Sequence, residues 1–103
     1  FYKGVPKLNF TRLEQIRDAV AIPLVLHGGS GVPDDMIRKA ISLGIAKVNV
    51  DTELRHAFAE AAQKVWHDDP EQCHLAVVLG AAREAVKRKV AEKIRLFGSS
   101  GKA

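Results

Sequence analysis

The sequence predicts an α/β fold built on a parallel sheet, and three observations support this fold class. Helical patterns alternate with short apolar runs along the 103 residues, in the order helix, strand, helix, strand, helix, helix. Two short apolar runs, at residues 24–26 and 46–50, predict strands, and the first lacks polar alternation, which predicts a strand buried on both faces. Each run ends abruptly in glycine and polar residues, as parallel strands do when they place chemistry at their carboxyl ends.

The first helix follows a predicted loop over residues 1–8. Asn9 or Thr11 can cap this helix, because short polar side chains accept hydrogen bonds from the first free backbone N–H groups. Its apolar residues recur at a spacing near 3.6, and Pro23 ends the connection to the first strand. The expected apolar face comprises Phe10, Leu13, Ile16 and Val20.

The second helix is predicted to start at Pro33, since proline suits the first helical position and the following Asp34 and Asp35 complement the helix dipole. Gly44 ends this helix, and the second strand follows at once. The expected buried stripe comprises Met36, Ile37, Ala40 and Ile41.

Two longer helices complete the chain. Thr52 is predicted to cap the third helix, which closes near Pro70, and the fourth is predicted over residues 75–97 with Gly98 as its C-cap. Two strands leave unpaired sheet edges, so further strands are expected from outside this chain. The expected buried faces comprise Leu54, Phe58, Ala61 or Ala62 and Val65 in the third helix, and Leu79, Ala82, Val86, Val90 and Ile94 in the fourth.

The composition narrows the class of protein. Hydrophobic residues at 47% and charged residues at 27% are ordinary globular values. The single cysteine, Cys73, excludes an internal disulfide and a cysteine pair for metal, which fits a reducing cytoplasm. We expect neither a membrane span nor a signal peptide.

The net charge of +4 raises the alternative of a small basic nucleic-acid-binding domain. The basic run at residues 87–89 is, however, interleaved with apolar residues at helical spacing, and we interpret it as a solvated helix face.

The glycine-rich turn at residues 28–31 predicts an anion site. Such turns expose backbone N–H groups, and the following helix adds its positive N-terminal end. Asn49, Asp51 and Thr52 precede the third helix in the same way, a pairing typical of the phosphate site after strands seven and eight of a (β/α)₈ barrel. The alternative is a simple tight turn, with Ser30 and Thr52 as caps. His27 favours a site, because a neutral imidazole there can bind a divalent metal when two or more further ligands arrive from other strands.

Two stretches carry a family resemblance. Residues 24–33 read Leu-Val-Leu-His-Gly-Gly-Ser-Gly-Val-Pro, and residues 40–52 read Ala-Ile-Ser-Leu-Gly-Ile-Ala-Lys-Val-Asn-Val-Asp-Thr. Together they resemble the class II, zinc-dependent ketose-bisphosphate aldolases, and the likeness extends to the opening at residues 1–4 and the ending at residues 95–103. The resemblance covers essentially the whole chain. It implies that residues 1–103 form the C-terminal third of one barrel domain. This third contains strands seven and eight with their flanking helices, and the upstream strands lie outside this chain.

This resemblance implies reversible aldol cleavage of a ketose 1,6-bisphosphate to dihydroxyacetone phosphate and an aldehyde such as glyceraldehyde 3-phosphate. The implied cofactor is zinc, with a monovalent cation as an optional second ion. In this family pattern His27 is a zinc ligand, Asn49 is a catalytic residue that contacts ketone or enediolate oxygens, and Arg55 reaches the distal phosphate. The residues expected to hold the substrate phosphate are Lys3, Gly28, Ser30, Asp51 and Thr52.

Several alternatives follow from the same comparison. Asp51 favours fructose 1,6-bisphosphate, since tagatose-type relatives commonly carry alanine there. The other zinc histidines and the catalytic aspartate of the family lie upstream of Phe1, so the chain is expected to work only with that segment, in a cytoplasmic dimer or tetramer. A second alternative is an inactive remnant that keeps the phosphate cradle as a binding or assembly module. Residues 73–78 depart from the family pattern, with Ala76 at the place of an arginine and no role for Cys73.

Overall fold

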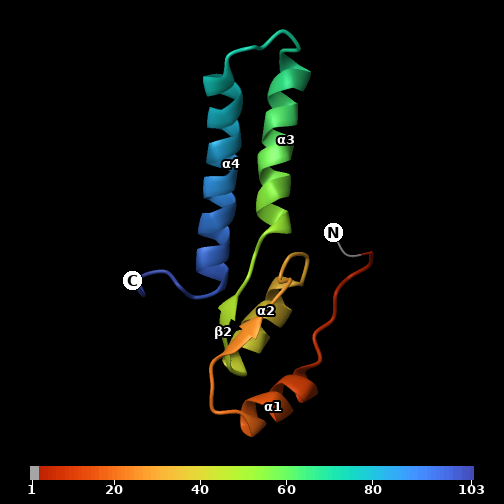
Figure 1. Cartoon of the computed structure of the whole chain (residues 1–103), viewed down its shortest axis with the longest axis vertical. Coiled ribbons are helices and arrows are strands. Elements are labelled where there is room, and N and C mark those ends of the chain that lie inside the picture. Colours follow the sequence, from red (N-terminus) through yellow and green to blue (C-terminus); the bar gives the residue numbers. More distant parts are fainter. Residues whose placement is uncertain (1–2) are drawn as a thin grey trace.

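The computed structural model describes residues 3–103, and its elements follow the predicted order. Phe1 and Tyr2, which begin the predicted first loop and the family-like opening, lie outside the described residues. Figure 1 shows a long helical hairpin above a smaller unit of alternating helices and strands. The elements are α1 (Phe10–Ala19), β1 (Leu24–Leu26), α2 (Asp34–Ser42), β2 (Ile45–Val48), α3 (Thr52–Asp68) and α4 (Leu75–Leu96).

The two strands form the predicted parallel pair, with Leu24 opposite Ile45 and Leu26 opposite Val48. The second strand begins one residue earlier than expected and ends at Val48 instead of residue 50. The prediction that β1 is buried on both faces is wrong for this chain, because the Val25 side chain is 42% exposed. The described residues supply no strand beyond these two, so the outer edges of the pair have no strand partner among residues 3–103.

The helix ends follow local side-chain chemistry. Of the two caps considered for α1, Asn9 is the one observed: its Oδ1 accepts a hydrogen bond of 2.9 Å from the Arg12 N–H. At the end of α4, Gly98 adopts a left-handed φ of +71°, and the Ser99 N–H reaches back to the Ile94 carbonyl at 2.9 Å. This is a Schellman motif, and it confirms Gly98 as the stop signal.

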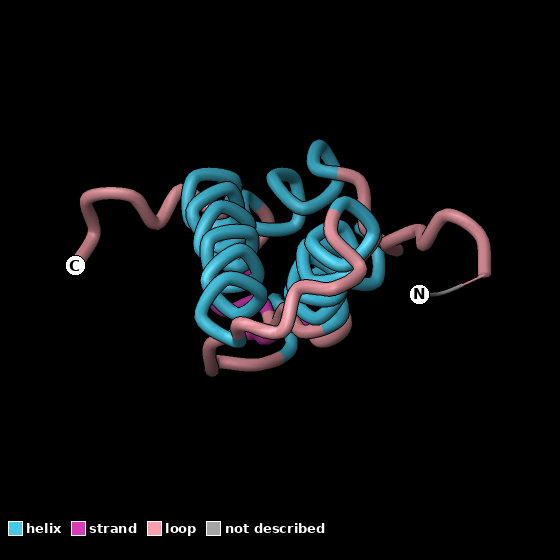
Figure 2. The backbone as a smooth tube through the Cα atoms, turned by 90° about the horizontal axis from the view of Figure 1, so that it is seen from above, coloured by secondary structure: helices cyan, strands magenta, loops and turns pink. Residues whose placement is uncertain are grey.

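The buried residues fall into two small groups. One joins the turn after β1 to α2 and β2, and the other lies between α3 and α4, which run side by side in Figures 1 and 2. The apolar faces predicted for α1 and α4 remain largely uncovered: α1 has no buried residue, and Leu79, Val90 and Ile94 of α4 are exposed. The buried apolar residues are Val32, Ile37, Ala40, Ile45, Ala62, Val78 and Ala82.

The shape is extended for a chain of this length. The radius of gyration is 17.3 Å, against about 13 Å for a compact domain of about 100 residues. The accessible surface is 7495 Å², whereas a compact monomer of this mass exposes about 5,700 Å². No helix among residues 3–103 is long and apolar enough to cross a membrane. The chain alone therefore buries much less surface than a self-contained domain.

Candidate functional site

The carboxyl ends of β1 and β2 lie side by side. Beyond the last ladder pair, the Asn49 N–H donates to the Leu26 carbonyl at 3.0 Å, and the Gly29 N–H donates to the Asn49 carbonyl at 3.3 Å. These two bonds extend the parallel pairing into the polar segments that follow each strand. The glycine-rich turn and the start of α3 consequently meet at one edge, as the sequence predicted for a site.

His27 and Asn49 face each other across this edge. The Asn49 Nδ2 lies 2.9 Å from the His27 Nδ1, and the imidazole is exposed. Two arrangements of hydrogens fit this contact. If Asn49 Nδ2 donates, the neutral ring carries its proton on Nε2; if the amide is turned over, Oδ1 accepts from Nδ1–H and the Nε2 lone pair is free. The second arrangement suits a metal ligand, because a second group that fixes the tautomer is the usual support for such a histidine.

Four backbone N–H groups are left open beside His27. Within the turn, the Gly29 N–H is used by Asn49 and the Gly31 N–H by the Glu53 carboxylate at 3.0 Å. Four of the remaining N–H groups of this edge make no hydrogen bond to another residue in the range 3–103. They belong to Gly28, Ser30, Asp51 and Thr52. Open N–H groups at a strand end and a helix N-terminus are what an anion requires.

Helix α3 begins in a different way from the prediction. Thr52 is the first helical residue and not the N-cap; the N-cap is Asp51, whose side chain makes no capping bond. The Asp51 carboxylate instead accepts a hydrogen bond of 2.8 Å from the Arg55 guanidinium, one turn along the helix. The hydroxyl oxygen of Ser30 accepts the Glu53 N–H at 3.4 Å, so this side chain caps α3 from outside the helix.

Lys3 is the predicted phosphate ligand that the structure does not join to the others. It lies in the exposed segment before α1, and within residues 3–103 no hydrogen bond or ion pair connects it to the turn. Its role stays a prediction, as does that of Arg55, which is exposed and held by Asp51.

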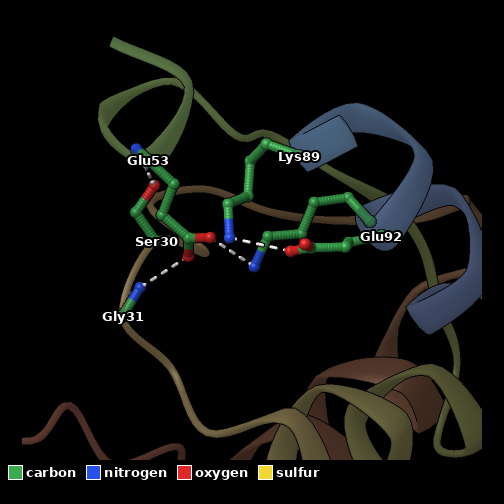
Figure 3. A network of polar contacts seen from close by, with 6 residues as sticks. Ser30, Gly31, Glu53, Lys89 and Glu92 are labelled. Carbon is green, nitrogen blue, oxygen red and sulfur yellow. Dashed lines mark hydrogen bonds and ion pairs between the residues drawn. The ribbon is translucent and has the colours of Figure 1, made fainter. Parts of the chain in front are cut away.

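A half-buried charge pair contacts the turn, and sequence reasoning missed it. Figure 3 shows the Glu53 carboxylate beside the Gly31 N–H, which donates to Oε1. The Lys93 Nζ lies 2.6 Å from Oε2 of the same carboxylate. Both side chains are only 15% exposed. One signal was available: Lys93 follows the buried Ala82 by about three helical turns, which places both on one face of α4.

The protonation of Glu53 reflects these contacts. Burial raises the pKa of the carboxyl, but the hydrogen bonds from Lys93 and Gly31, together with the charges of Lys93 and Lys89, outweigh it and hold the pKa below its usual value. Because the folded-state pKa is depressed, the stabilisation is present above the ordinary carboxyl range and is lost as the pH falls through the folded-state pKa. Glu53 is therefore ionised at neutral pH.

The described residues do not form a complete metal site by themselves. Within residues 3–103 no three histidine, cysteine, aspartate or glutamate residues are grouped closely enough to hold an ion. His27 fits one position of a metal site, since its ring is exposed at the strand end and Asn49 can fix its tautomer. Any further ligands must come from outside the described residues.

Gly29 is required by close packing against β2. A Cβ on Gly29 would lie 2.8 Å from Val48 Cγ1 and 3.4 Å from the Asn49 carbonyl oxygen. Because valine is stiff at χ1, we expect Gly29→Ala to destabilise the fold by about 1–3 kcal/mol. The measurement is thermal unfolding followed by circular dichroism. The control is Gly80→Ala in α4, where nothing lies within 4 Å of the new Cβ and helix propensity predicts a gain of about 0.5–1 kcal/mol. An unchanged Tm in Gly29→Ala would contradict the close packing.

Comparisons with known proteins agree with this arrangement. The family model for "Fructose-bisphosphate aldolase class-II" matches residues 1–102. A sulfofructosephosphate aldolase of Alkalicoccus urumqiensis is 56% identical over 102 residues, and a fructose-bisphosphate aldolase of Geobacillus stearothermophilus is 50% identical. Each match covers 99% of this chain and 36% of the relative. The crystal structure of the YdjI aldolase from Escherichia coli superposes with a TM-score of 0.80 at 49% identity, over 95% of this chain and 36% of that chain.

The chain thus spans about a third of the length of the curated relatives it matches. The family model matches residues 1–102, which is nearly the whole chain. The chain belongs to the class-II fructose-bisphosphate aldolase family.

Proposed function

We propose that this chain is the C-terminal part of a class II aldolase barrel that cleaves a ketose bisphosphate. In this proposal β1 and β2 are strands seven and eight of a (β/α)₈ barrel, and the upstream strands complete it. The extended shape and the exposed Val25 support the proposal, because a complete barrel would cover the face of β1 that carries Val25. The observation that carries it is the group of four open N–H groups beside His27.

In this proposal, different residues of the chain bind the two ends of the substrate. The N–H groups of Gly28, Ser30, Asp51 and Thr52, with the N-terminus of α3, hold one phosphate of the substrate. Lys3 adds positive charge to the same phosphate. Arg55 reaches the anionic group at the other end of the substrate, and Asp51 sets the direction of its guanidinium. The two ends of the substrate are thus fixed from one helix start.

His27 would hold zinc in this proposal, together with ligands from the upstream segment. When bound, zinc supplies a Lewis acid for the ketose carbonyl and for the negative charge that develops on cleavage. Asn49 lies next to His27, so its amide can donate to a carbonyl oxygen placed there. A monovalent cation and a dimeric or tetrameric assembly are part of the same proposal.

The identity of the substrate has two candidates within the family. Asp51 favours fructose 1,6-bisphosphate. The 56% identity to a sulfofructosephosphate aldolase favours a ketose phosphate that carries a sulfo group. Arg55 can pair with either a terminal phosphate or a terminal sulfonate, because both are tetrahedral oxyanions. Both compounds therefore belong in the first assay.

The test is a chimera in which residues 1–102 replace the matching C-terminal region of the Geobacillus stearothermophilus fructose-bisphosphate aldolase. We expect the purified chimera to retain zinc in native mass spectrometry and to cleave at least one of the two substrates. A folded, zinc-loaded chimera that cleaves neither would overturn the proposal and support an inactive remnant. Adding the 103-residue chain in trans to the truncated host is the matched control for covalent attachment.

Asp51 is expected to set the preference between epimeric sugars. In the chimera, Asp51→Ala should shift the ratio of kcat/KM by about tenfold toward tagatose 1,6-bisphosphate, because Arg55 loses the carboxylate that fixes it and the pocket loses a group near the sugar. Steady-state kinetics with both bisphosphates measure this ratio. The control is Asp68→Ala, which breaks the Lys64 pair at the other end of α3. Unchanged selectivity in Asp51→Ala would show that the sugar is chosen elsewhere.

A further inference from the structure

Glu53 stands behind the proposed phosphate site without belonging to it. Its carboxylate bridges two elements: Oε1 accepts from the Gly31 N–H in the turn, and Oε2 pairs with Lys93 near the end of α4. We propose that Glu53 is a positioning residue whose carboxylate fixes the glycine-rich turn so that its open N–H groups and the Ser30 hydroxyl face the substrate phosphate. This inference rests on the proposed function, because the phosphate site is part of that function.

The hydrogen bond from Gly31 determines which way the turn presents its donors. Gly31 has a left-handed φ of +79°, and its N–H points to Glu53 at 3.0 Å. The neighbouring Ser30 N–H is left without a protein partner among residues 3–103. Fixing one peptide of a short turn restricts the next, so loss of this acceptor should release the direction of the Ser30 N–H.

The backbone of Glu53 acts on the same turn. Its N–H donates to the Ser30 hydroxyl oxygen at 3.4 Å, which uses one acceptor site of that hydroxyl and leaves its hydrogen free. A phosphate oxygen is a suitable acceptor for that hydrogen. Side chain and backbone of one residue therefore hold two successive residues of the turn, as Figure 3 shows.

Lys93 offsets the negative charge that the Glu53 carboxylate places next to the proposed phosphate site. An unpaired negative charge next to a phosphate site would weaken phosphate binding by repulsion. The ammonium group at 2.6 Å neutralises that charge, and both side chains are largely buried, so solvent screens the pair less than a surface pair. The pair keeps the acceptor function of the carboxylate while cancelling its charge.

Acceptor and charge can be separated by substitution in the chimera. Glu53→Gln keeps an oxygen for the Gly31 N–H but loses the charge pair. The exchange Glu53→Lys with Lys93→Glu restores a charge pair but places no acceptor at residue 53, since an ammonium group only donates. Glu60→Gln, an exposed position two turns along α3, is the matched control. Each variant is measured for the Tm, for KM and kcat with the preferred ketose bisphosphate, and for binding of inorganic phosphate by calorimetry.

The expected result is that the KM and the Tm respond to different changes. Glu53→Gln should lower the Tm and leave the KM within about twofold. The exchange should recover much of the Tm and raise the KM about tenfold, with kcat within about threefold, which corresponds to loss of one positioned hydrogen bond. If the KM follows the Tm across the variants, Glu53 has only a structural role and the inference is wrong.

Two further comparisons keep the test decisive. If the exchange variant does not fold, Glu53→Leu replaces it, because leucine and glutamine at this position both lack the charge and differ in the acceptor. An equal KM in those two variants would overturn the inference. If the unsubstituted chimera has no aldolase activity, the proposed function fails, and the dissociation constant for inorganic phosphate then decides the positioning role by the same tenfold criterion.

Discussion

Replacing His27 by alanine in the chimera is expected to abolish zinc retention and to lower kcat/KM by at least about a thousandfold. The reason is that His27 ends β1 directly before the glycine-rich turn, and within residues 3–103 no group of side chains can replace it as a ligand. Removing the imidazole takes away one metal ligand while the four open N–H groups remain. Phosphate binding should therefore survive the substitution.

Three measurements on His27→Ala check this expectation: native mass spectrometry for zinc, steady-state kinetics for cleavage, and calorimetry for inorganic phosphate. The matched control is His67→Ala in the last turn of α3, an exposed histidine away from the strand ends. The control should keep both zinc and activity. Full activity in His27→Ala would end the assignment of His27 as a metal ligand, and loss of phosphate binding together with zinc would show that the two sites are not independent.

Local chemistry explains why much of this architecture could be predicted from the sequence. The strands, the Asn9 cap and the Gly98 stop all depend on residues that are close together in the chain. The parallel pairing joins segments about twenty residues apart, but it follows from the helix between two short strands, which is the connection that parallel strands need. The meeting of the turn with the start of α3 follows from the same logic, because parallel strands end at one edge. These features could be predicted without knowing which elements pack on the sheet.

Features that depend on distant partners could not be predicted. Of the apolar stripe that was expected to be buried on α4, Ala82 is buried, but Leu79, Val90 and Ile94 are exposed. Val78, which lies outside that stripe, is buried instead. A stripe shows which face needs cover but not which element covers it. For the same reason the pairing of Glu53 with Lys93 could not be predicted. These residues lie far apart in the sequence, and a charged residue on a helix is usually expected to face solvent.

Asn49 is expected to perform two tasks that substitution can separate. When its Oδ1 accepts from His27 Nδ1–H, the ring presents Nε2 to the metal and the amide Nδ2 keeps both hydrogens for a substrate oxygen. Asn49→Leu removes both tasks at nearly constant volume. We expect zinc affinity to fall about 10–100-fold, which is the usual cost of losing the partner of a ligating histidine, and kcat to fall about a hundredfold or more.

Asn49→Asp separates the two tasks, because a carboxylate still accepts from His27 Nδ1–H but has no hydrogen to donate to the substrate. This variant should retain zinc and show the same loss of kcat as Asn49→Leu, with zinc affinity measured by competition against a chelator and kcat measured at saturating zinc. If Asn49→Asp releases zinc as readily as Asn49→Leu, the amide does not orient the imidazole. If it keeps full kcat, the amide donates nothing to the substrate, and its contact with His27 is its only task at this edge of the sheet.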